Sequence, residues 1–326
     1  MKPVVALGDL VMDLITPVRL PILAGQNQEV SSLQPQPGGG CNFLIHAARL
    51  GLRVSSAGVV GDDAFGAQLA QILTAEGVDT RPIYVAPGSV TATVLDLIDH
   101  EQKAHCFIGH AGKGGPMPVT PLVEALIRDA GAVFLQGYTL LETQMQPALP
   151  LMLEIAAETH VPVYYDVGPP TKFASRELLR HVLDHAYGLM MTEDEVPLIA
   201  EGRDGDEAYT WLFAQGVQLL VVKRGAHGCL LVTPESRESI PAYPVDVADT
   251  VGAGDCFNAG FLYGRMRGWP LADCARLANA SGGVCAMKIG AGRNVPTHEE
   301  IAALLAANGV KLDLTPQPPL HSGEAE

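Results

Sequence analysis

Short apolar runs alternate with helical stretches along most of this chain, and this alternation limits the folds that it can adopt. The runs have the length of strands that are buried on both faces, as in a parallel sheet. The expected strands are Val4–Leu7, Val54–Val60, Ala132–Leu135, Val161–Tyr165, Gly188–Met191 and Leu219–Val222. The expected helices are Cys41–Leu50, Ala64–Glu76, Leu122–Asp129, Met145–Glu158, Leu178–His185 and Asp206–Gln215. Strands and helices in alternation form βαβ units, so we predict an α/β fold with a doubly wound, mostly parallel sheet sandwiched by helices.

One region interrupts this alternation. Arg81–Val85, Thr91–Ile98 and Ala104–Ile108 read as consecutive strands with turns and no helix between them. With Glu29–Gln34 they predict a small antiparallel sheet that projects from the main one. A lid over a ligand site is the use we favour. A dimer contact is a second use of such a sheet, and a simple extension of the sheet edge is the alternative.

The expected organisation is a single domain over residues 1–313, with the lid built from about residues 14–36 and 81–110. The tail Leu314–Glu326 contains P-Q-P-P-L and has the composition of a disordered segment.

The charge of the chain limits its partners. A formal net charge of −15 argues against nucleic acid and against an anionic membrane surface. No run approaches the roughly 18 apolar residues of a membrane span. The six cysteines form no C-x-x-C pair, which favours buried thiols in a reducing compartment. We therefore expect a cytoplasmic protein, in which any phosphate ligand is held by local groups because the overall field repels it.

The stretch D-T-V-G-A-G-D-C-F-N-A-G, Asp249–Gly260, joins small residues to the start of a helix. Gly252, Ala253 and Gly254 would form the turn, and the free N–H groups of a helix N-terminus make an anion site. Asp255 on this turn has two roles open to it. It can cap the helix through its side-chain oxygen, or it can act as a general base beside the anion.

A second glycine cluster, Pro37–Asn42, also precedes a helix. The amide of Asn42 both donates and accepts hydrogen bonds, as recognition of a polyol requires, and the carboxylate of Asp13 can accept from two hydroxyls. The alternatives are a flexible loop that ends in an asparagine cap, and a solvated aspartate. Neither a Walker-type phosphate loop nor a strict G-x-G-x-x-G fingerprint is present.

These pieces together resemble the ribokinase-like carbohydrate kinase family, also called the PfkB family. Asp249–Asp255 resembles its C-terminal signature, complete and in order. The resemblance covers about residues 4–300. The other matching stretches are the glycine run with Asn42, Ala47–Gly51, Gly58–Gly66, Val221–Gly228, Ala278–Gly282 and Gly290–Thr297.

The resemblance implies a role for each matching residue. Asp255 would be the catalytic base, and the backbone amides of Gly252, Ala253 and Gly254 would form the anion hole for the transferred phosphoryl group. The residues that would hold the sugar are Asp13, Gly38, Gly39 and Asn42.

The resemblance also implies ATP and Mg²⁺. The segment Lys223–Gly228 would wrap the nucleotide, and Glu195 would lie near Mg²⁺ and the phosphates. Asp249, with the loop around Gly290, resembles the part that binds a monovalent cation such as K⁺ in many members. The nucleotide-binding residues would be Thr192, Glu195, Lys223, Gly225, Gly228 and Asn279, with Asn279 beside the base.

Three departures from the family pattern affect the inference about the substrate more than the inference about the reaction. The glycine turn is one residue shorter before Asn42, Thr192 replaces the asparagine of the N-x-x-E motif, and V-G-P-P follows Asp166. None of the three involves Asp255. Two residues outside the motifs, Gln136 and Tyr138, end an apolar strand and are candidates to reach the substrate.

The resemblance implies a phosphotransferase that uses ATP to phosphorylate a hydroxymethyl group of a small sugar or sugar derivative, by in-line transfer. A nucleoside kinase of the same fold is an alternative, with Phe43, Phe107 and Tyr138 as candidates for an apolar slot. A nicotinamide-dependent oxidoreductase and a non-catalytic sugar-binding regulator are the others. The histidines His46, His105 and His110 show no metal-ligand spacing. Which sugar is used stays open.

Overall fold

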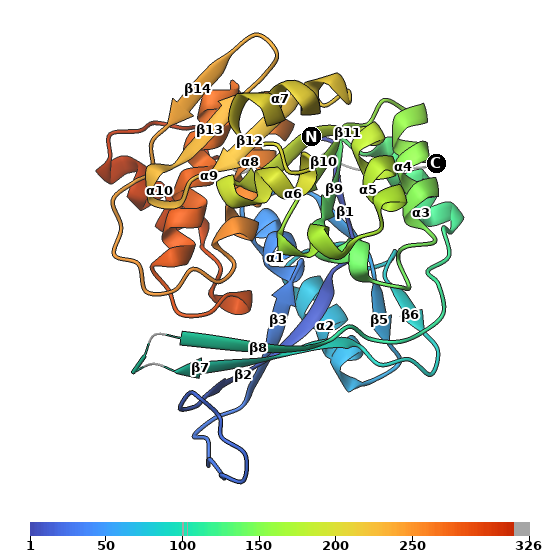
Figure 1. The fold of residues 1–326 in the computed structure, drawn as a ribbon, viewed down its shortest axis with the longest axis vertical. Helices are drawn as coiled ribbons and strands as arrows, with labels where there is room; N and C mark the ends of the chain where they lie inside the picture. The colour runs from blue at the N-terminus through green and yellow to red at the C-terminus, as the bar shows by residue number, and fades with distance from the viewer. Residues whose placement is uncertain (100, 103, 316–326) are drawn as a thin grey trace, which may run out of the picture.

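The computed structural model describes residues 1–99, 101–102 and 104–315 and confirms the predicted fold class (Figure 1). The main sheet has the strand order β14-β13-β12-β11-β10-β9-β1-β4. Neighbouring strands are parallel except in the pairs β12–β13 and β13–β14, because β13 runs opposite to the others. Its strands are β1 (Val4–Leu7), β4 (Val54–Ala57), β9 (Ala132–Gln136), β10 (Val163–Asp166), β11 (Ala186–Thr192), β12 (Leu219–Lys223), β13 (Cys229–Val232) and β14 (Arg237–Ile240). Of the predicted tail, residues 316–326 lie outside the described residues.

Helices cover both faces of this sheet because alternate strand residues point to opposite sides. Val4 and Ala6 of β1 belong to one apolar core, whereas Val5 and Leu7 belong to the other. The first core includes residues of α1 (Cys41–Arg49), α2 (Ala64–Ala75), α8 (Ala253–Met266), α9 (Leu271–Ala286) and α10 (His298–Ala307). The second includes residues of α3 (Pro121–Asp129), α4 (Leu149–Glu158), α5 (Arg176–His185), α6 (Val196–Ile199) and α7 (Gly205–Ala214). Among the described residues, no helix is long and apolar enough to cross a bilayer.

A separate four-stranded sheet lies below the main body in the view of Figure 1. Its order is β3-β2-β7-β8, formed by β3 (Gln34–Gly39), β2 (Leu10–Pro17), β7 (Ala92–Asp99) and β8 (Ala104–His110). Two pairs are antiparallel as predicted, but β2 and β7 in the middle are parallel. The use of this sheet as a lid or as a contact between two copies, and the predicted extent of the lid, stay predictions.

Three details of the prediction are wrong. The strand expected at Glu29–Gln34 begins only at Gln34, and the small sheet gains β2 instead. The strand expected at Arg81–Val85 is β6 (Tyr84–Ala86), which pairs with β5 (Val59–Gly61) outside the small sheet. The strand expected at Val54–Val60 is interrupted at Gly58, where a Cβ atom would lie 2.9 Å from Cδ1 of Leu10. The close passage of β2 therefore accounts for both the glycine and the break.

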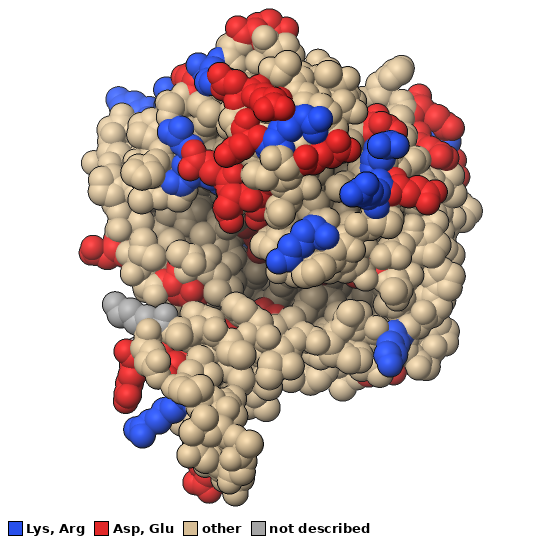
Figure 2. All heavy atoms as spheres, in the orientation of Figure 1, with Lys and Arg blue, Asp and Glu red and all other residues tan. Residues whose placement is uncertain are grey.

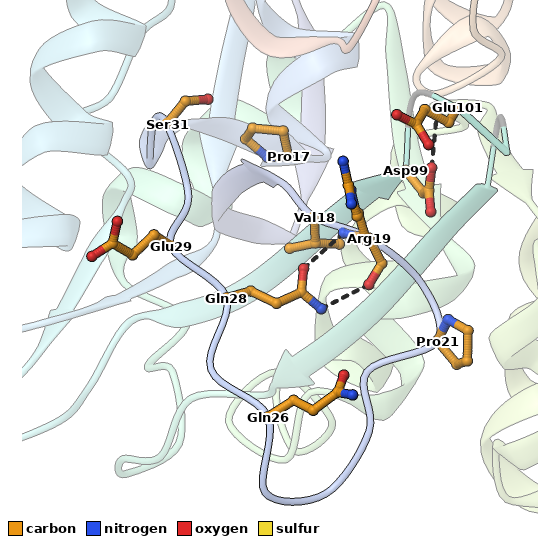
Figure 3. Close-up of a pocket in the computed structure, with 10 residues that line it drawn as sticks. All are labelled: Pro17, Val18, Arg19, Pro21, Gln26, Gln28, Glu29, Ser31, Asp99 and Glu101. Carbon is orange, nitrogen blue, oxygen red and sulfur yellow. Dashed lines mark hydrogen bonds between the residues drawn. The ribbon is translucent and has the colours of Figure 1, made fainter.

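The loop between β2 and β3 lies beside the turn between β7 and β8, and Asp99 at the end of β7 contacts both (Figure 3). Asp99 accepts hydrogen bonds from the backbone N–H groups of Leu20 (2.8 Å), Glu101 (3.0 Å) and Gln102 (2.9 Å). Gln28 also forms two hydrogen bonds within the loop. Its Oε1 accepts from the N–H of Arg19 and its Nε2 donates to the carbonyl of Arg19, both at 2.8 Å. Asp99 thus joins the two connections at this end of the small sheet, together with the hydrogen bond from the side-chain amide of Gln102 to the carbonyl of Leu20.

Replacing Asp99 with alanine is expected to loosen this loop without unfolding the main body, because the N–H of Leu20 loses its acceptor and the turn at Glu101 and Gln102 that contacts the loop loses two more hydrogen bonds. Hydrogen exchange should become at least several-fold faster over residues 18–33 and stay unchanged in α8. Glu101→Ala, which removes an exposed carboxylate from the same turn, is the matched control. Unchanged exchange over residues 18–33 in Asp99→Ala would contradict the assignment.

Candidate active site

A cavity of about 770 Å³ opens at the carboxyl ends of the parallel strands, where open α/β sheets bind their ligands. Figure 2 shows the molecule hollowed between the main body and the small sheet. The predicted residues that line the cavity are Gly39, Thr192, Glu195, Lys223, Gly225, Gly228, Ala253, Gly254, Asp255 and Asn279. Asp9, Gln136, Tyr138 and Asp166 line it as well. One cavity therefore joins the predicted catalytic and nucleotide residues.

Helix α8 begins at the predicted glycine turn. Gly252 precedes its first residue with a left-handed backbone (φ 74°), and a Cβ atom there would lie 2.6 Å from the Cβ of Ala291. Glycine is therefore required both by conformation and by space. Of the three predicted anion-hole amides, that of Ala253 also donates to the carbonyl of Thr250 at 3.2 Å. The first turn still directs free N–H groups towards the cavity that Ala253 and Gly254 line.

The side chain of Asp255 does not cap α8, since this helix start has no side-chain cap hydrogen bond. Its carboxylate instead accepts from Nδ2 of Asn42 at 3.1 Å and from Nε2 of Gln136 at 2.6 Å. Both donors come from other elements, the first turn of α1 and the end of β9. Of the two roles that the sequence left open, the geometry favours the one that faces the cavity.

Asn42 lies behind Asp255 with both of its polar atoms bonded to the protein. Its Oδ1 accepts from the N–H of Gly292 at 2.7 Å, and its Nδ2 donates to the carboxylate of Asp255. The residue is only 3% exposed. Gly292 opens the short helix η5 (Gly292–Asn294). In this arrangement Asn42 holds the carboxylate and the Gly292 backbone, so direct contact of its amide with a sugar stays a prediction.

Burial is the main cause that raises the pKa of Asp255 to about 7, and the negative charge of Asp166 raises it further. The hydrogen bond from Asn42 and the positive charge of Lys223 act in the opposite direction. A carboxylate with a pKa near neutrality is a stronger base than an ordinary aspartate and is still ionised in half of the molecules at that pH.

Asp13 lies on β2, opposite the glycine turn of β3. A Cβ atom at Gly38 would lie 2.0 Å from an oxygen of the Asp13 carboxylate, so the chain needs glycine there. Burial first, and then the charges of Asp96 and Asp255, raise the pKa of Asp13 to about 7. Asp13, Gly38 and Gly39 thus lie close together on β2 and β3. Of the three only Gly39 lines the cavity, so their contact with a sugar stays a prediction.

Asp9 is a site residue that the sequence analysis did not identify. It follows Gly8 directly after β1 with a left-handed backbone (φ 54°), its N–H donates to Oε1 of Glu142, and its carbonyl accepts from Gly40. Burial, above all, raises the pKa of its side chain to about 7. The signal was an aspartate at the carboxyl end of the first strand, the edge at which such sheets bind ligands.

Lys223 marks the other end of the cavity. Its Nζ lies 2.6 Å from Oδ1 of Asp166, and both side chains are largely buried. Glu195, at the end of η3 (Glu193–Glu195), accepts from the N–H of Thr192 at 2.8 Å, and burial raises its pKa. Asp166 was noted in the sequence only as the end of a strand, but it sets the charge around Lys223.

The turn after β12 has the close backbone packing that its glycines suggest. Gly225 (φ 53°) opens η4 (Gly225–His227), and a Cβ atom at Gly228 would lie 2.0 Å from the carbonyl oxygen of Ile240. Asn279 of α9 donates to the carbonyls of Ile240 (3.2 Å) and Pro241 (3.0 Å). These bonds fix the segment after β14 against the cavity, so a nucleotide base beside Asn279 stays a prediction.

The predicted cation at Asp249 stays a prediction too. Its two carboxylate oxygens accept from the N–H groups of Val251 (3.1 Å) and Gly290 (2.8 Å), and Nε2 of His105 lies 3.7 Å from Oδ1. Within the part of the chain that the structure describes, no group of three or more His, Cys, Asp or Glu side chains is arranged to hold a metal. A divalent ion would then depend on ligand phosphates as well as on protein carboxylates.

The aromatic residues proposed for a nucleoside slot do not come together. Phe43 is fully buried and stacks on Phe134 with ring centroids 3.9 Å apart, so the suggestion that Phe43 lines such a slot is wrong. Tyr138 lines the cavity as expected, whereas Phe107 is an exposed residue of β8 that does not. His46 is a packed core histidine, as expected for a residue without metal spacing.

Comparison with known proteins gives consistent results. Residues 1–298 match the model of a family described as pfkB family carbohydrate kinase. The chain is 29% identical over 321 residues to fructokinase-1 of Oryza sativa, covering 93% of this chain and 97% of that protein. It is also 29% identical over 314 residues to ribokinase of Bacillus subtilis, covering 94% and 100%. The structure of Arabidopsis thaliana ribokinase complexed with ribose and ATP superposes with a TM-score of 0.80 at 22% identity, covering 93% and 98%.

The Asp13→Asn variant is expected to be more stable than the wild type at about pH 8, by about 1–3 kcal/mol in the free energy of unfolding. The pKa of Asp13 is raised from 3.8 to about 7, so the folded state binds the proton more tightly than the unfolded state. The free energy of unfolding therefore falls as the pH rises from about 4 to about 7, and asparagine removes this loss.

Urea denaturation at about pH 4 and about pH 8 measures the effect, which should be small at the lower pH. Asp62→Asn, which changes an exposed aspartate without a hydrogen-bond partner among the described residues, is the control. An Asp13→Asn variant that is less stable than the wild type at about pH 8 would show that the Asp13 carboxylate is not an uncompensated buried charge.

Proposed function

The chain belongs to the pfkB family of carbohydrate kinases, and we propose that it transfers the γ-phosphoryl group of ATP to a hydroxymethyl group of a small sugar or sugar derivative. The observation that carries this proposal is the position of Asp255. Its half-buried carboxylate lies in the first turn of α8 beside free backbone N–H groups, and it faces a cavity large enough for both substrates.

In the proposed reaction Asp255 accepts the proton of the attacking hydroxyl group, a contribution of typically about 10²–10⁴-fold. Asn42 and Gln136 orient its carboxylate by donating to different oxygens. The N–H groups of Gly252 and Gly254, with the shared N–H of Ala253, stabilise the negative charge on the transferred phosphoryl group. The remaining contribution is positioning, because phosphoryl transfer needs the attacking and leaving oxygens in line.

The nucleotide would occupy the end of the cavity at Lys223, Gly225 and Gly228. Its phosphates would face Lys223, which Asp166 holds in place. The carboxylates of Glu195 and Asp166 are suitable donors for Mg²⁺, which supplies charge neutralisation of the phosphates when it is bound. Their hard oxygen ligands at the cavity wall fit this ion.

The alternatives are less well supported. Family membership removes the nicotinamide-dependent oxidoreductase. A nucleoside acceptor is less well supported because Phe43 is buried and cannot line a slot for its base. The acceptor end of the cavity is lined by carboxyl and amide groups, which suit the hydroxyls of a sugar. A sugar-binding regulator without activity has no use for a base oriented by two amide donors.

Asp255→Asn is expected to reduce the release of ADP with any accepted sugar by about 10²-fold or more, because the amide cannot accept the proton. The measurement is ADP release over a panel of sugars and nucleosides, for the wild type and the variant in parallel. Asp246→Asn, at an exposed position on the segment that leads to α8, is the matched control and should keep full activity. Equal turnover by wild type and Asp255→Asn would exclude Asp255 as the base.

The kcat/KM of the wild type is expected to rise with pH and level off above about pH 7, because Asp255 must lose its proton before it can act. Asp9 and Asp13 have pKa values in the same range and interact with Asp255, so the profile reports the titration of the group. Initial rates between about pH 5 and about pH 9 test this. A flat profile over that range would contradict a base of raised pKa.

A further inference from the structure

We infer that the acceptor end of the cavity selects sugars without negative charge and prefers an amino sugar to a sugar acid of the same shape. This inference rests on the proposed function, because it concerns the second substrate of the same site. It would place sugar acids and sugar phosphates outside the substrate range.

Two carboxylates line this end of the cavity, and two more lie close to it. Asp255 and Asp9 line the cavity, whereas Asp13 and Asp96 lie on the neighbouring strands β2 and β7 of the small sheet and are not among the lining residues. Asp13 is within electrostatic reach of both Asp96 and Asp255, and Asp9 is within reach of Asp13. The four therefore form a continuous group between β7 and α8, and each raises the cost of ionising the next.

No lysine or arginine forms an ion pair with this group among the described residues, although the charge of Lys223 partly offsets that of Asp255. In the described parts of the chain, no lysine or arginine nitrogen lies within 4.0 Å of any of the four carboxylates. The one basic side chain within that distance, among the described residues, is His105, whose imidazole lies 3.3 Å from Asp96. Lys223 is paired with Asp166 at 2.6 Å. Lys172 is exposed over the ring of Phe173, and Arg293 is exposed beyond Gly292.

The side chain of Asp9 is independent evidence that a hydrogen-bond donor of a ligand binds at this end of the cavity. Asp9 is only 5% exposed and lines the cavity, and its Oδ2 is buried without a hydrogen-bond partner among the described residues. A buried carboxylate oxygen without a partner is costly. Because the side chain of Asp9 lines the cavity, a hydroxyl or ammonium group of a ligand can donate to its carboxylate, although Oδ2 itself is covered by protein. An ionised carboxylate or phosphate on the ligand has no proton to give and would add a further negative charge.

The size of the effect follows from Coulomb's law. A like charge at about 10 Å and an effective dielectric constant of about 20 changes binding by on the order of ten-fold, and an opposite charge has the reverse effect. Several carboxylates act together here. We therefore expect an acid to bind at least about 10²-fold more weakly than the neutral sugar, and an amine to bind at least as tightly as the neutral sugar.

The test compares a neutral sugar with its amine and its acid by calorimetric binding and by ADP release. The first set is fructose, its amine isoglucosamine and its acid ketogluconate, which keep the same terminal hydroxymethyl group. If the activity panel identifies another sugar, the amine and acid of that sugar replace the set. The expected order of kcat/KM is amine equal to or above neutral, and both far above the acid.

Asp96→Asn is the informative variant, because Asp96 carries charge but has no place in the proposed chemistry. It should raise the kcat/KM for the acid relative to the neutral sugar by on the order of ten-fold. Glu101→Gln, an exposed carboxylate at the end of the same strand pair, should leave the ratio unchanged. If Asp96→Asn does not fold, the salt dependence of acid binding by the wild type replaces it, since added salt should weaken the repulsion.

The outcomes separate the two proposals. An acid that is phosphorylated as well as the neutral sugar overturns the inference and leaves the proposed kinase intact. An unchanged acid-to-neutral ratio in Asp96→Asn also overturns it. If no polyol is phosphorylated while Mg²⁺-ATP is bound, the proposed function fails and the inference falls with it.

Discussion

The half-buried carboxylate of Asp255 is the group on which the geometry of the site depends. It accepts one hydrogen bond from the amide of Asn42 in the first turn of α1 and another from the amide of Gln136 at the end of β9. Asn42 in turn accepts a hydrogen bond from the backbone N–H of Gly292. Elements that are far apart in sequence therefore meet at one side chain. Because the donors are neutral amides, they orient the carboxylate without neutralising it, and it keeps the basicity that burial confers.

This arrangement is paid for in stability. Asp9 is buried and Asp13 and Asp255 are half-buried, each with a pKa near 7. A fold selected only for stability would pair such groups with cations or replace them. The chain does pair Lys223 with Asp166 at the end of the cavity proposed for the nucleotide. The absence of such pairing at the proposed acceptor end, within the residues described, is consistent with the proposal that a ligand binds there.

The sequence predicts the regular parts well because they follow from local patterns. The strands of the main sheet are buried apolar runs, and the start of α8 follows from Gly252 and its small neighbours. What it misses depends on contacts between distant segments. The break at Gly58 comes from the passage of Leu10, and the bonding of Asn42 to Asp255 and Gly292 cannot be read from residue 42 alone. Asp9 was missed for the same reason, since only the fold places it beside Gly39.

The two ends of the cavity differ in charge, and this difference bears on the direction of the proposed reaction. In the proposed reaction the phosphoryl group starts near Lys223 and ends on a sugar beside Asp9, with Asp13 and Asp96 close behind on the small sheet. The sugar thereby gains a charge of about −1.5 to −2, as a phosphate monoester does at neutral pH. The carboxylates that accept the hydroxyls of a neutral sugar then repel the product, while the ionised product has lost the hydroxyl that bonded Asp255. Under the proposed function, the acidic end that admits an uncharged sugar therefore also favours release of its phosphate.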